Sequence, residues 1–388
     1  MIAFTGKFWK VIGPSQWSMK SNEFRVFTTT SSRLSNLHTS DNSNDLYSHT
    51  EKYSHSHVYA YLQEAKKDII EKHNLYHLND RLTQALDYNL RDIHHIGSKI
   101  LIPTFRDVRK NPHISSADLK SLNILGWCME LLFMTFNIQD DLMDKSITRF
   151  GKPCWHKLDS IGNSAINDTL IFENMIFYLL DKHFRNFKCY TQLVDNFREM
   201  ILVAACGQAL DMQLSQMPVE SFTMEMYRYT VEFKNGYCAF YLPFAAAMIL
   251  AGNTNPLSFQ KTKSVSLKMA FYLQLQNDYF DIYGSPKATE KIGTDIEANK
   301  CTWLAIQCMQ RASKEQKQIM MECYGKKDSH MVQQVKDLYN ILNIGDLYVH
   351  FEEDIIAEIT SEIQRASNEV PAIAMMHVVD RMRQSDLH

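Results

Sequence analysis

The sequence predicts an all-α protein whose single domain extends from about residue 55 to residue 388. Apolar residues recur at helical spacing along this whole stretch. Proline and glycine, at 9 and 13 of 388 residues, mostly fall between the apolar stripes. No alternation of polar and apolar residues, which would indicate a strand, persists over any length. A domain of this length fits many buried helices around a central cavity better than a four-helix bundle.

Three apolar stripes mark the first expected helices. Residues three or four apart share one helix face, so each stripe predicts a helix with one buried side. The stripes are Tyr59, Leu62, Ala65, Ile69 and Ile70, then Trp127, Leu131, Met134 and Ile138, and then Phe172, Met175, Ile176 and Leu179. The longest apolar run, residues 237–252, is interrupted by Pro243 and predicts a buried helix. Because it is shorter than the roughly 18 residues of a membrane helix, we expect no membrane span.

The first 54 residues differ from the rest in composition. Up to residue 40 they hold five positive charges, many serines and threonines, and Glu23 as the single acidic residue. This composition resembles an organelle transit peptide, and a disordered tail without an address is the alternative. The eight cysteines form no Cys-x-x-Cys pair, which predicts reduced thiols in an intracellular protein of the cytoplasm or mitochondrion. A formal charge of −3 argues against a nucleic-acid partner.

Two clusters of carboxylates carry the chemistry. The first is Asp140-Asp141-Leu142-Met143-Asp144, and the second runs from Asn277 through Asp278 to Asp281. Asp140 and Asp144 are four residues apart, so on a helix they share one face about 6 Å apart along the axis. Oxygen ligands bunched in this way are suited to Mg²⁺ ions that also hold a substrate phosphate.

Basic residues follow both clusters. Arg149 comes after the first cluster, and Lys291 and Lys300 come after the second. Carboxylates for a metal, followed by arginine and lysine, predict a site for a highly charged anion such as a diphosphate. The alternative, two solvated helix ends, does not account for the matching basic followers.

The sequence resembles the trans-isoprenyl diphosphate synthase family, in particular its farnesyl diphosphate synthases. The resemblance covers about residues 81–311 and includes the strings DDLMDKSITRFGKPCW (140–155), FYLPFAAAMILAG (240–252) and KIGTDIEANKCTWLAIQCMQR (291–311). It implies an isoprenoid synthase bundle of about ten or more helices, with the two acidic clusters facing each other across a deep apolar cavity. It also implies a homodimer.

The resemblance assigns roles to individual residues. Asp140 and Asp144, with Asn277 and Asp281, match Mg²⁺ ligands, for three ions together with the substrate diphosphate, while Asp141 supports the first pair. Asn277 stands where the family has aspartate, and we expect its metal to bind less tightly. The residues matched to substrate are Arg149, Lys234, Lys291 and Lys300 for the allylic diphosphate, Gln274 at the reacting end of the prenyl chain, and Gln208 and Asp211 facing the cavity. Phe136 and Asn137, one turn before Asp140 and Asp141, are expected in the cavity wall.

The sequence departs from the family where the second substrate, isopentenyl diphosphate, binds. A gap-free alignment puts His94 in place of the family's lysine and Gly97 in place of its arginine. Phe133 replaces a glutamine, Phe150 replaces the second arginine of a pair, and residues 381–388 replace a basic tail. Each charge-assisted phosphate contact is worth about 1.5–3 kcal/mol, so losing three cations predicts much weaker binding of this acceptor.

From these losses we predict a terpene synthase, a carbon–oxygen lyase that ionises farnesyl diphosphate and rearranges the cation into a sesquiterpene. Family members of this kind in insects make volatiles and pheromones. In the family, bulky residues four and five positions before the first aspartate close the cavity at fifteen carbons. Those positions are the large Phe136 and the small Thr135 here, which predicts a fifteen-carbon prenyl chain, with ten or twenty carbons as alternatives. One alternative is a farnesyl or geranyl diphosphate synthase. The other is a weakly catalytic partner subunit, and the presence of Asp140, Asp141 and Asp144 argues against that second alternative.

Overall fold

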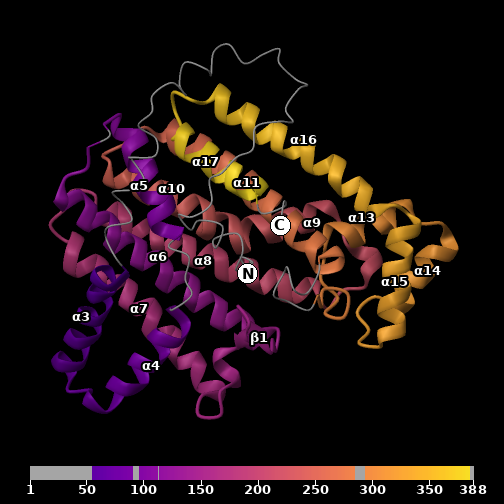
Figure 1. The fold of residues 1–388 in the computed structure, drawn as a ribbon, viewed down its shortest axis with the longest axis horizontal. Helices are drawn as coiled ribbons and strands as arrows, with labels where there is room; N and C mark the ends of the chain where they lie inside the picture. The colour runs from indigo at the N-terminus through magenta and orange to yellow at the C-terminus, as the bar shows by residue number, and fades with distance from the viewer. Residues whose placement is uncertain (1–54, 91–95, 112, 285–292, 385–388) are drawn as a thin grey trace, which may run out of the picture.

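The computed structural model describes residues 55–90, 96–111, 113–284 and 293–384. The described chain is almost entirely helical, as predicted (Figure 1). Its α-helices are α3 (His55–His73), α4 (Asn79–Leu90), α5 (Ile96–Arg109), α6 (Ser116–Met143), α7 (Ala165–Phe184), α8 (Tyr190–Leu214), α9 (Met224–Val231), α10 (Leu242–Leu250), α11 (Pro256–Tyr283), α13 (Trp303–Arg311), α14 (Lys314–Cys323), α15 (Ser329–Ile341), α16 (Ile344–Arg365) and α17 (Ala372–Gln384). A π-helical segment, η5 (Glu232–Tyr241), joins α9 to α10. Short 3₁₀ turns are η1 (Tyr76–Leu78), η2 (Trp155–Lys157), η3 (Gly162–Ser164) and η4 (Val219–Ser221).

Helix α6 is the centre of the bundle. Ser115 fixes its start, since the Ser115 side chain accepts a hydrogen bond from the Asp118 backbone N–H at 3.1 Å. The helix is apolar on every side and packs against α5 and α7. Trp127 and Met134 are each only 2% exposed. A helix that is buried all round places whatever lies at its end deep in the protein, and the first acidic cluster lies at the end of α6.

All three predicted apolar stripes are confirmed as buried helix faces on α3, α6 and α7. The buried apolar residues form one cluster that extends from Leu62 to Met382. The prediction of a separate tail falls on residues 1–54, which lie outside the described residues.

Two details differ from the sequence prediction. Prolines are expected mostly between the helices, but Pro103 lies inside α5. The strands β1 (Thr148–Arg149) and β2 (Lys152–Pro153) form a small antiparallel hairpin after α6. Its two turn residues, Phe150 and Gly151, have φ of 52° and 72°, as a tight two-residue hairpin turn requires. Phe150 therefore stands at a turn position, and the hairpin directs Arg149 back toward the end of α6.

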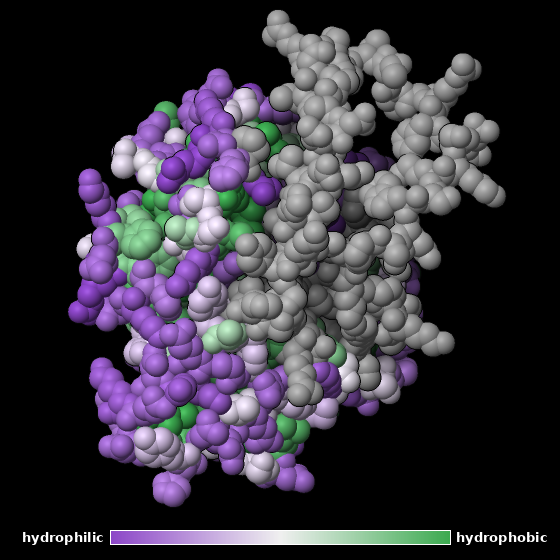
Figure 2. Space-filling model, turned by 60° about the vertical axis from the view of Figure 1, so that its left-hand side comes forward, coloured by the Kyte–Doolittle hydropathy of each residue, from purple (hydrophilic) through white to green (hydrophobic). Residues whose placement is uncertain are grey.

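Among the described residues, α6 alone is long and apolar enough to cross a membrane, but 89% of its most apolar window is buried inside the protein. It is a core helix, and it exceeds in length the run at 237–252 that the sequence analysis singled out. On the face shown in Figure 2, hydrophilic residues predominate and the visible apolar residues form small separate patches.

Candidate active site

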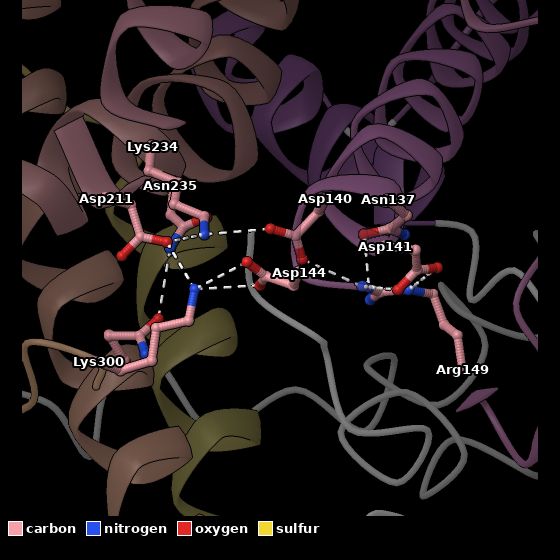
Figure 3. A network of polar contacts seen from close by, with 10 residues as sticks. Asn137, Asp140, Asp141, Asp144, Arg149, Asp211, Lys234, Asn235 and Lys300 are labelled. Carbon is pink, nitrogen blue, oxygen red and sulfur yellow. Dashed lines mark hydrogen bonds and ion pairs between the residues drawn. The ribbon is translucent and has the colours of Figure 1, made fainter. Parts of the chain in front are cut away.

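Arg149 holds the last turn of α6 (Figure 3). Its Nε and Nη2 atoms each donate to a different oxygen of Asp141 at 2.8 Å, and Nη2 also lies 3.2 Å from Asp140. Nη1 donates to the amide oxygen of Asn137 at 3.4 Å. The bidentate pair occupies both oxygens of Asp141, which fits a supporting role for this residue, and the metal role of Asp140 and Asp144 stays a prediction.

Lys234 reaches the same cluster from η5. Its Nζ lies 2.7 Å from an oxygen of Asp211 on α8 and 3.2 Å from an oxygen of Asp140. Gly207 makes this approach possible, because a Cβ atom at Gly207 would overlap the backbone of Lys234. Asp211 lies one helical turn after Gly207, so the same close contact brings Asp211 against the lysine.

Lys300 completes the network from the loop before α13. Its Nζ donates to both oxygens of Asp144, at 3.0 and 3.1 Å, and to Asp211 at 3.0 Å. Asp211 thus joins two lysines from distant parts of the chain. The structure brings eight predicted residues into one network, which are Asn137, Asp140, Asp141, Asp144, Arg149, Asp211, Lys234 and Lys300.

The network carries a net negative charge. Four carboxylates, those of Asp140, Asp141, Asp144 and Asp211, face the three cations of Arg149, Lys234 and Lys300, so the formal sum is 3 − 4 = −1. Because of this excess, the network alone would repel a diphosphate, whereas an added divalent cation would make it an anion site. Oxygen donors one turn apart at a helix end fit Mg²⁺.

The pKa values show how strongly these charges depend on one another. Burial alone would raise the pKa of Asp140, but Lys234 and Arg149 hold it well below its ordinary value. Burial likewise opposes ionisation of Asp211, yet Lys234 and Lys300 lower its pKa. The pKa of Lys234 is raised, because Asp140 and Asp211 outweigh the effect of burial. All of these groups are therefore ionised at neutral pH.

The second acidic cluster is arranged differently. Asp278 is buried and accepts hydrogen bonds from the Gln274 side chain at 2.8 Å and from the Trp303 backbone N–H at 2.9 Å. Burial raises its pKa to about 7 despite these bonds. Asp278 thus ties α11 to the start of α13 and has a structural role that the sequence analysis did not assign.

Asp281 holds a loop in this structure. Its two oxygens accept the backbone N–H groups of Thr294 at 3.2 Å and Asp295 at 3.0 Å. Gly293 allows the loop to come so close, because a Cβ there would overlap the Asp281 carbonyl oxygen. The predicted metal role of Asn277 and Asp281 stays a prediction, and in the described chain no group of three or more histidine, cysteine or acidic residues is arranged to hold a metal.

The remaining predicted residues lie outside the network of Asp140, Arg149 and Lys234. Gln274 orients Asp278 and lies 3.4 Å from the Asn235 side chain. Gln208 is 6% exposed, and within the described chain neither atom of its amide has a hydrogen-bond partner. Phe136 is buried on α6, while Lys291 and His94 lie outside the described residues.

Sequence reasoning underrated Asp211 and missed Asn235, which lies beside the network in Figure 3. The available signal for Asp211 was its position four residues after Gly207. A glycine followed by a carboxylate one turn later marks a close helix contact with a charge beside it.

Comparison with known proteins identifies relatives over most of the chain. The polyprenyl synthetase family model matches residues 79–342. Farnesyl pyrophosphate synthase of Bos taurus is 35% identical over 78% of this chain and 86% of its own length. Farnesyl pyrophosphate synthase of Saccharomyces cerevisiae is 38% identical over 65% of this chain and 72% of its own length. Farnesyl pyrophosphate synthase 1, mitochondrial, of Arabidopsis thaliana is 36% identical over 72% of this chain and 74% of its own length.

These relatives overturn the prediction of a terpene synthase. Their names describe chain-elongating prenyltransferases, so the predictions of a lyase, a sesquiterpene product and a pheromone role are wrong. The prediction of a terpene synthase failed because it considered only the cations at the aligned positions of the isopentenyl diphosphate pocket. The network around Asp140 could not correct it, since ionising an allylic diphosphate is a step that both reactions share.

The resemblance to the trans-isoprenyl diphosphate synthases and the all-α fold are both confirmed. The family match spans more than half of the 388 residues, and the bovine relative is aligned over most of its own length. The chain belongs to the polyprenyl synthetase family.

Proposed function

We propose that this protein is a prenyltransferase of the farnesyl diphosphate synthase type, which joins isopentenyl diphosphate to an allylic diphosphate and releases diphosphate. The observation that carries the proposal is the network at the end of α6, in which three cations from different parts of the chain converge on the first acidic cluster. The names of the relatives favour elongation over rearrangement.

Mg²⁺ fits the donor set, and members of the family use it. Asp140 and Asp144 would hold the metal, with Asn277 and Asp281 as the candidates on α11. When bound, Mg²⁺ neutralises the diphosphate and stabilises it as it leaves. Lys300 now contacts both oxygens of Asp144, so metal binding at Asp144 would redirect this ammonium group toward the diphosphate.

The chain's own residues would divide the work. Arg149, Lys234 and Lys300 bind the oxygens of the allylic diphosphate, and the surrounding apolar core excludes water. With water excluded, the double bond of the acceptor attacks the allylic carbon as its bond to oxygen breaks, and a proton then leaves the new chain. The buried Gln208 amide supports a ligand nearby, since a buried amide without a partner costs about 1–3 kcal/mol.

We assign a fifteen-carbon product from the residues one turn before Asp140. Phe136 is 4% exposed and Thr135 is fully buried, so both side chains fill space in the protein core beside α6. Shortening Phe136 to alanine should shift the product from fifteen toward twenty carbons.

The test is elongation by the purified full chain. Geranyl diphosphate, radiolabelled isopentenyl diphosphate and Mg²⁺ should yield labelled farnesyl diphosphate. Asp140→Asn is the inactive control, and Asp159→Asn, which removes an exposed acid of the neighbouring loop, should behave like the unaltered protein. Consumption of geranyl diphosphate without incorporation of label, or no turnover, would contradict the proposal.

We further propose a homodimer that covers part of α7. Ile166 and Leu170 lie one turn apart on this helix and are 55% and 53% exposed. Two large apolar side chains on one face favour a protein contact. Light scattering should give the mass of two chains, and Leu170→Glu should shift it toward one.

The N-terminal segment gives a last proposal, import into an organelle. One relative is named as mitochondrial, and residues 1–54 have the composition of a transit peptide. Fusing residues 1–54 to a fluorescent protein tests this, because an untargeted tail would leave the fluorescence diffuse.

A further inference from the structure

Lys300 is held by its backbone as well as by its ammonium group. The Lys300 backbone N–H donates to the carbonyl oxygen of Asp295 at 3.0 Å, and the Lys300 carbonyl oxygen accepts the Tyr324 hydroxyl at 2.8 Å. Tyr324 is 5% exposed, so the core fixes the ring that makes this second hydrogen bond. Lysine carries its charge on a flexible stem of four carbons, and a fixed backbone therefore limits the space that the charge can reach.

Asn299, the residue before Lys300, ties this backbone to the end of α8. The side-chain amide nitrogen of Asn299 donates to the carbonyl oxygens of Ser215 and Met217, each at 2.8 Å. Ser215 is the C-cap of α8, where carbonyl groups have no partner within the helix. Asp211 lies one turn before Ser215 on the same helix, and its carboxylate accepts the Lys300 ammonium group at 3.0 Å. The Asn299 amide therefore fixes Lys300 relative to the helix that carries its partner.

The backbone at Asn299 accounts for the presence of asparagine at this position. Its φ is 51°, in the left-handed region that asparagine adopts more readily than most residues other than glycine. Gly325 packs against it, because a Cβ atom at Gly325 would lie 3.0 Å from the Asn299 Cβ atom. Glycine at position 299 would allow the same turn, but it would lack the amide that bonds to α8.

We propose that Asn299 is a positioning residue, which sets the backbone of Lys300 so that the ammonium group reaches the Asp144 and Asp211 carboxylates and the substrate diphosphate (Figure 3). This assignment rests on the proposed role of Lys300 in binding the allylic diphosphate. Both amide hydrogens of Asn299 are used in the contact to α8, so Asn299 acts on the substrate through Lys300. A cation that is placed before the substrate arrives avoids the cost of ordering a loop on binding.

The assignment predicts a loss that is confined to one substrate. Asn299→Gly keeps the left-handed turn and removes both amide hydrogen bonds. KM for geranyl diphosphate should rise about tenfold, the lower end of the range for losing one charge-assisted contact. KM for isopentenyl diphosphate should stay within about twofold, because Lys300 is assigned to the other substrate. The matched control is Asn343→Gly, which makes the same exchange at an exposed asparagine with a φ of 50° before α16.

A double-mutant cycle separates positioning from a general structural role. In a Lys300→Met background, Asn299→Gly should change KM for geranyl diphosphate by less than about twofold, because the group that Asn299 positions is absent. Tyr324→Phe removes only the hydroxyl that bonds to the Lys300 carbonyl, so it should show the same preference for one substrate. This variant decides the matter if Asn299→Gly does not fold. Equal effects of Asn299→Gly in both backgrounds, or parallel increases in both KM values, would overturn the assignment.

Calorimetry with inorganic diphosphate and Mg²⁺ makes the test independent of turnover. Asn343→Gly should bind diphosphate like the unaltered protein, and Asn299→Gly should bind it about tenfold more weakly. Equal binding by Asn299→Gly and the unaltered protein would overturn the assignment. Absence of elongation by the unaltered protein would refute the proposed function alone, because the comparison of diphosphate binding still stands.

Discussion

Replacing Asp211 with asparagine tests whether one carboxylate holds the two active-site lysines together. Asp211 is 8% exposed and lies 2.7 Å from Lys234 and 3.0 Å from Lys300. At an effective dielectric of about 20, these two attractions amount to about 6 kcal/mol each before desolvation is subtracted. Removing one partner from a buried pair typically costs about 3–5 kcal/mol. Asp140 stays beside Lys234 and Asp144 stays beside Lys300 in the variant, so the loss is that of the two contacts to Asp211.

That cost can be converted into a melting temperature. An entropy of unfolding of about 2.1 cal/mol/K per residue gives about 0.7 kcal/mol/K for a domain of this size, so Tm should fall by about 4–7 °C. The pKa of Asp211 is lowered on folding, so its contribution is present above its unfolded pKa of about 4 and is lost only as the pH falls through the lower folded value. The difference in Tm should therefore be constant from pH 5 to pH 8.

The assay is differential scanning fluorimetry beside steady-state elongation. Asp195→Asn, an exposed acid on the same helix, should melt like the unaltered protein. The double variant Asp211→Asn/Lys300→Met should lose less stability than the sum of the two single variants, because the contact between these two residues is lost only once, and it should not recover activity. A single variant that melts within about 1 °C of the unaltered protein, or a double variant whose losses add, would refute the reasoning.

Three further predictions concern the two acidic clusters. Asp140→Ala should lower the elongation rate by about a thousandfold, as expected for several kcal/mol of lost metal stabilisation, with an unchanged circular dichroism spectrum; retained activity would exclude Asp140 as a ligand. Gly293→Ala should displace the loop bonded to Asp281 and lower both Tm and diphosphate affinity, whereas Gly345→Ala, which meets only ordinary contacts, should do neither. Burial raises the pKa of Asp278 to about 7, so the folded state binds the extra proton and stability falls as the pH rises from about 4 to 7. Denaturant titrations should show that Asp278→Asn removes about 4 kcal/mol of this dependence, and identical pH profiles would contradict the assignment.

The sequence was a good guide wherever the relevant neighbours are close along the chain. The stripe through Trp127 and Met134 identified α6, because helical spacing depends only on local geometry. The same reasoning placed Asp140 and Asp144 together at the end of that helix. It could not show that Asp281 holds a loop, since that role depends on Gly293 approaching from another segment.

Asp211 shows the same limit at the active site. Its two lysine partners lie in η5 and in the loop before α13, and only the folded chain brings them to one carboxylate. The sequence pattern identifies the aspartate and the two lysines, but it does not show that the aspartate contacts both lysines. The resemblance supplied Lys234 and Lys300 as cations for a diphosphate, whereas the structure adds what holds them in the absence of the ligand.

The wrong prediction of a terpene synthase has the same physical origin. A diphosphate responds to the positions of charges in space, and a gap-free alignment records only their positions along the chain. At His94 and Gly97 the alignment registers two lost cations. In the folded protein, α17 packs against α5, at a place that a comparison restricted to residues 81–311 cannot include. A loss of charge in a motif therefore predicts a loss of binding only after every helix that packs against the motif has been searched for a replacement, including those from the far end of the chain.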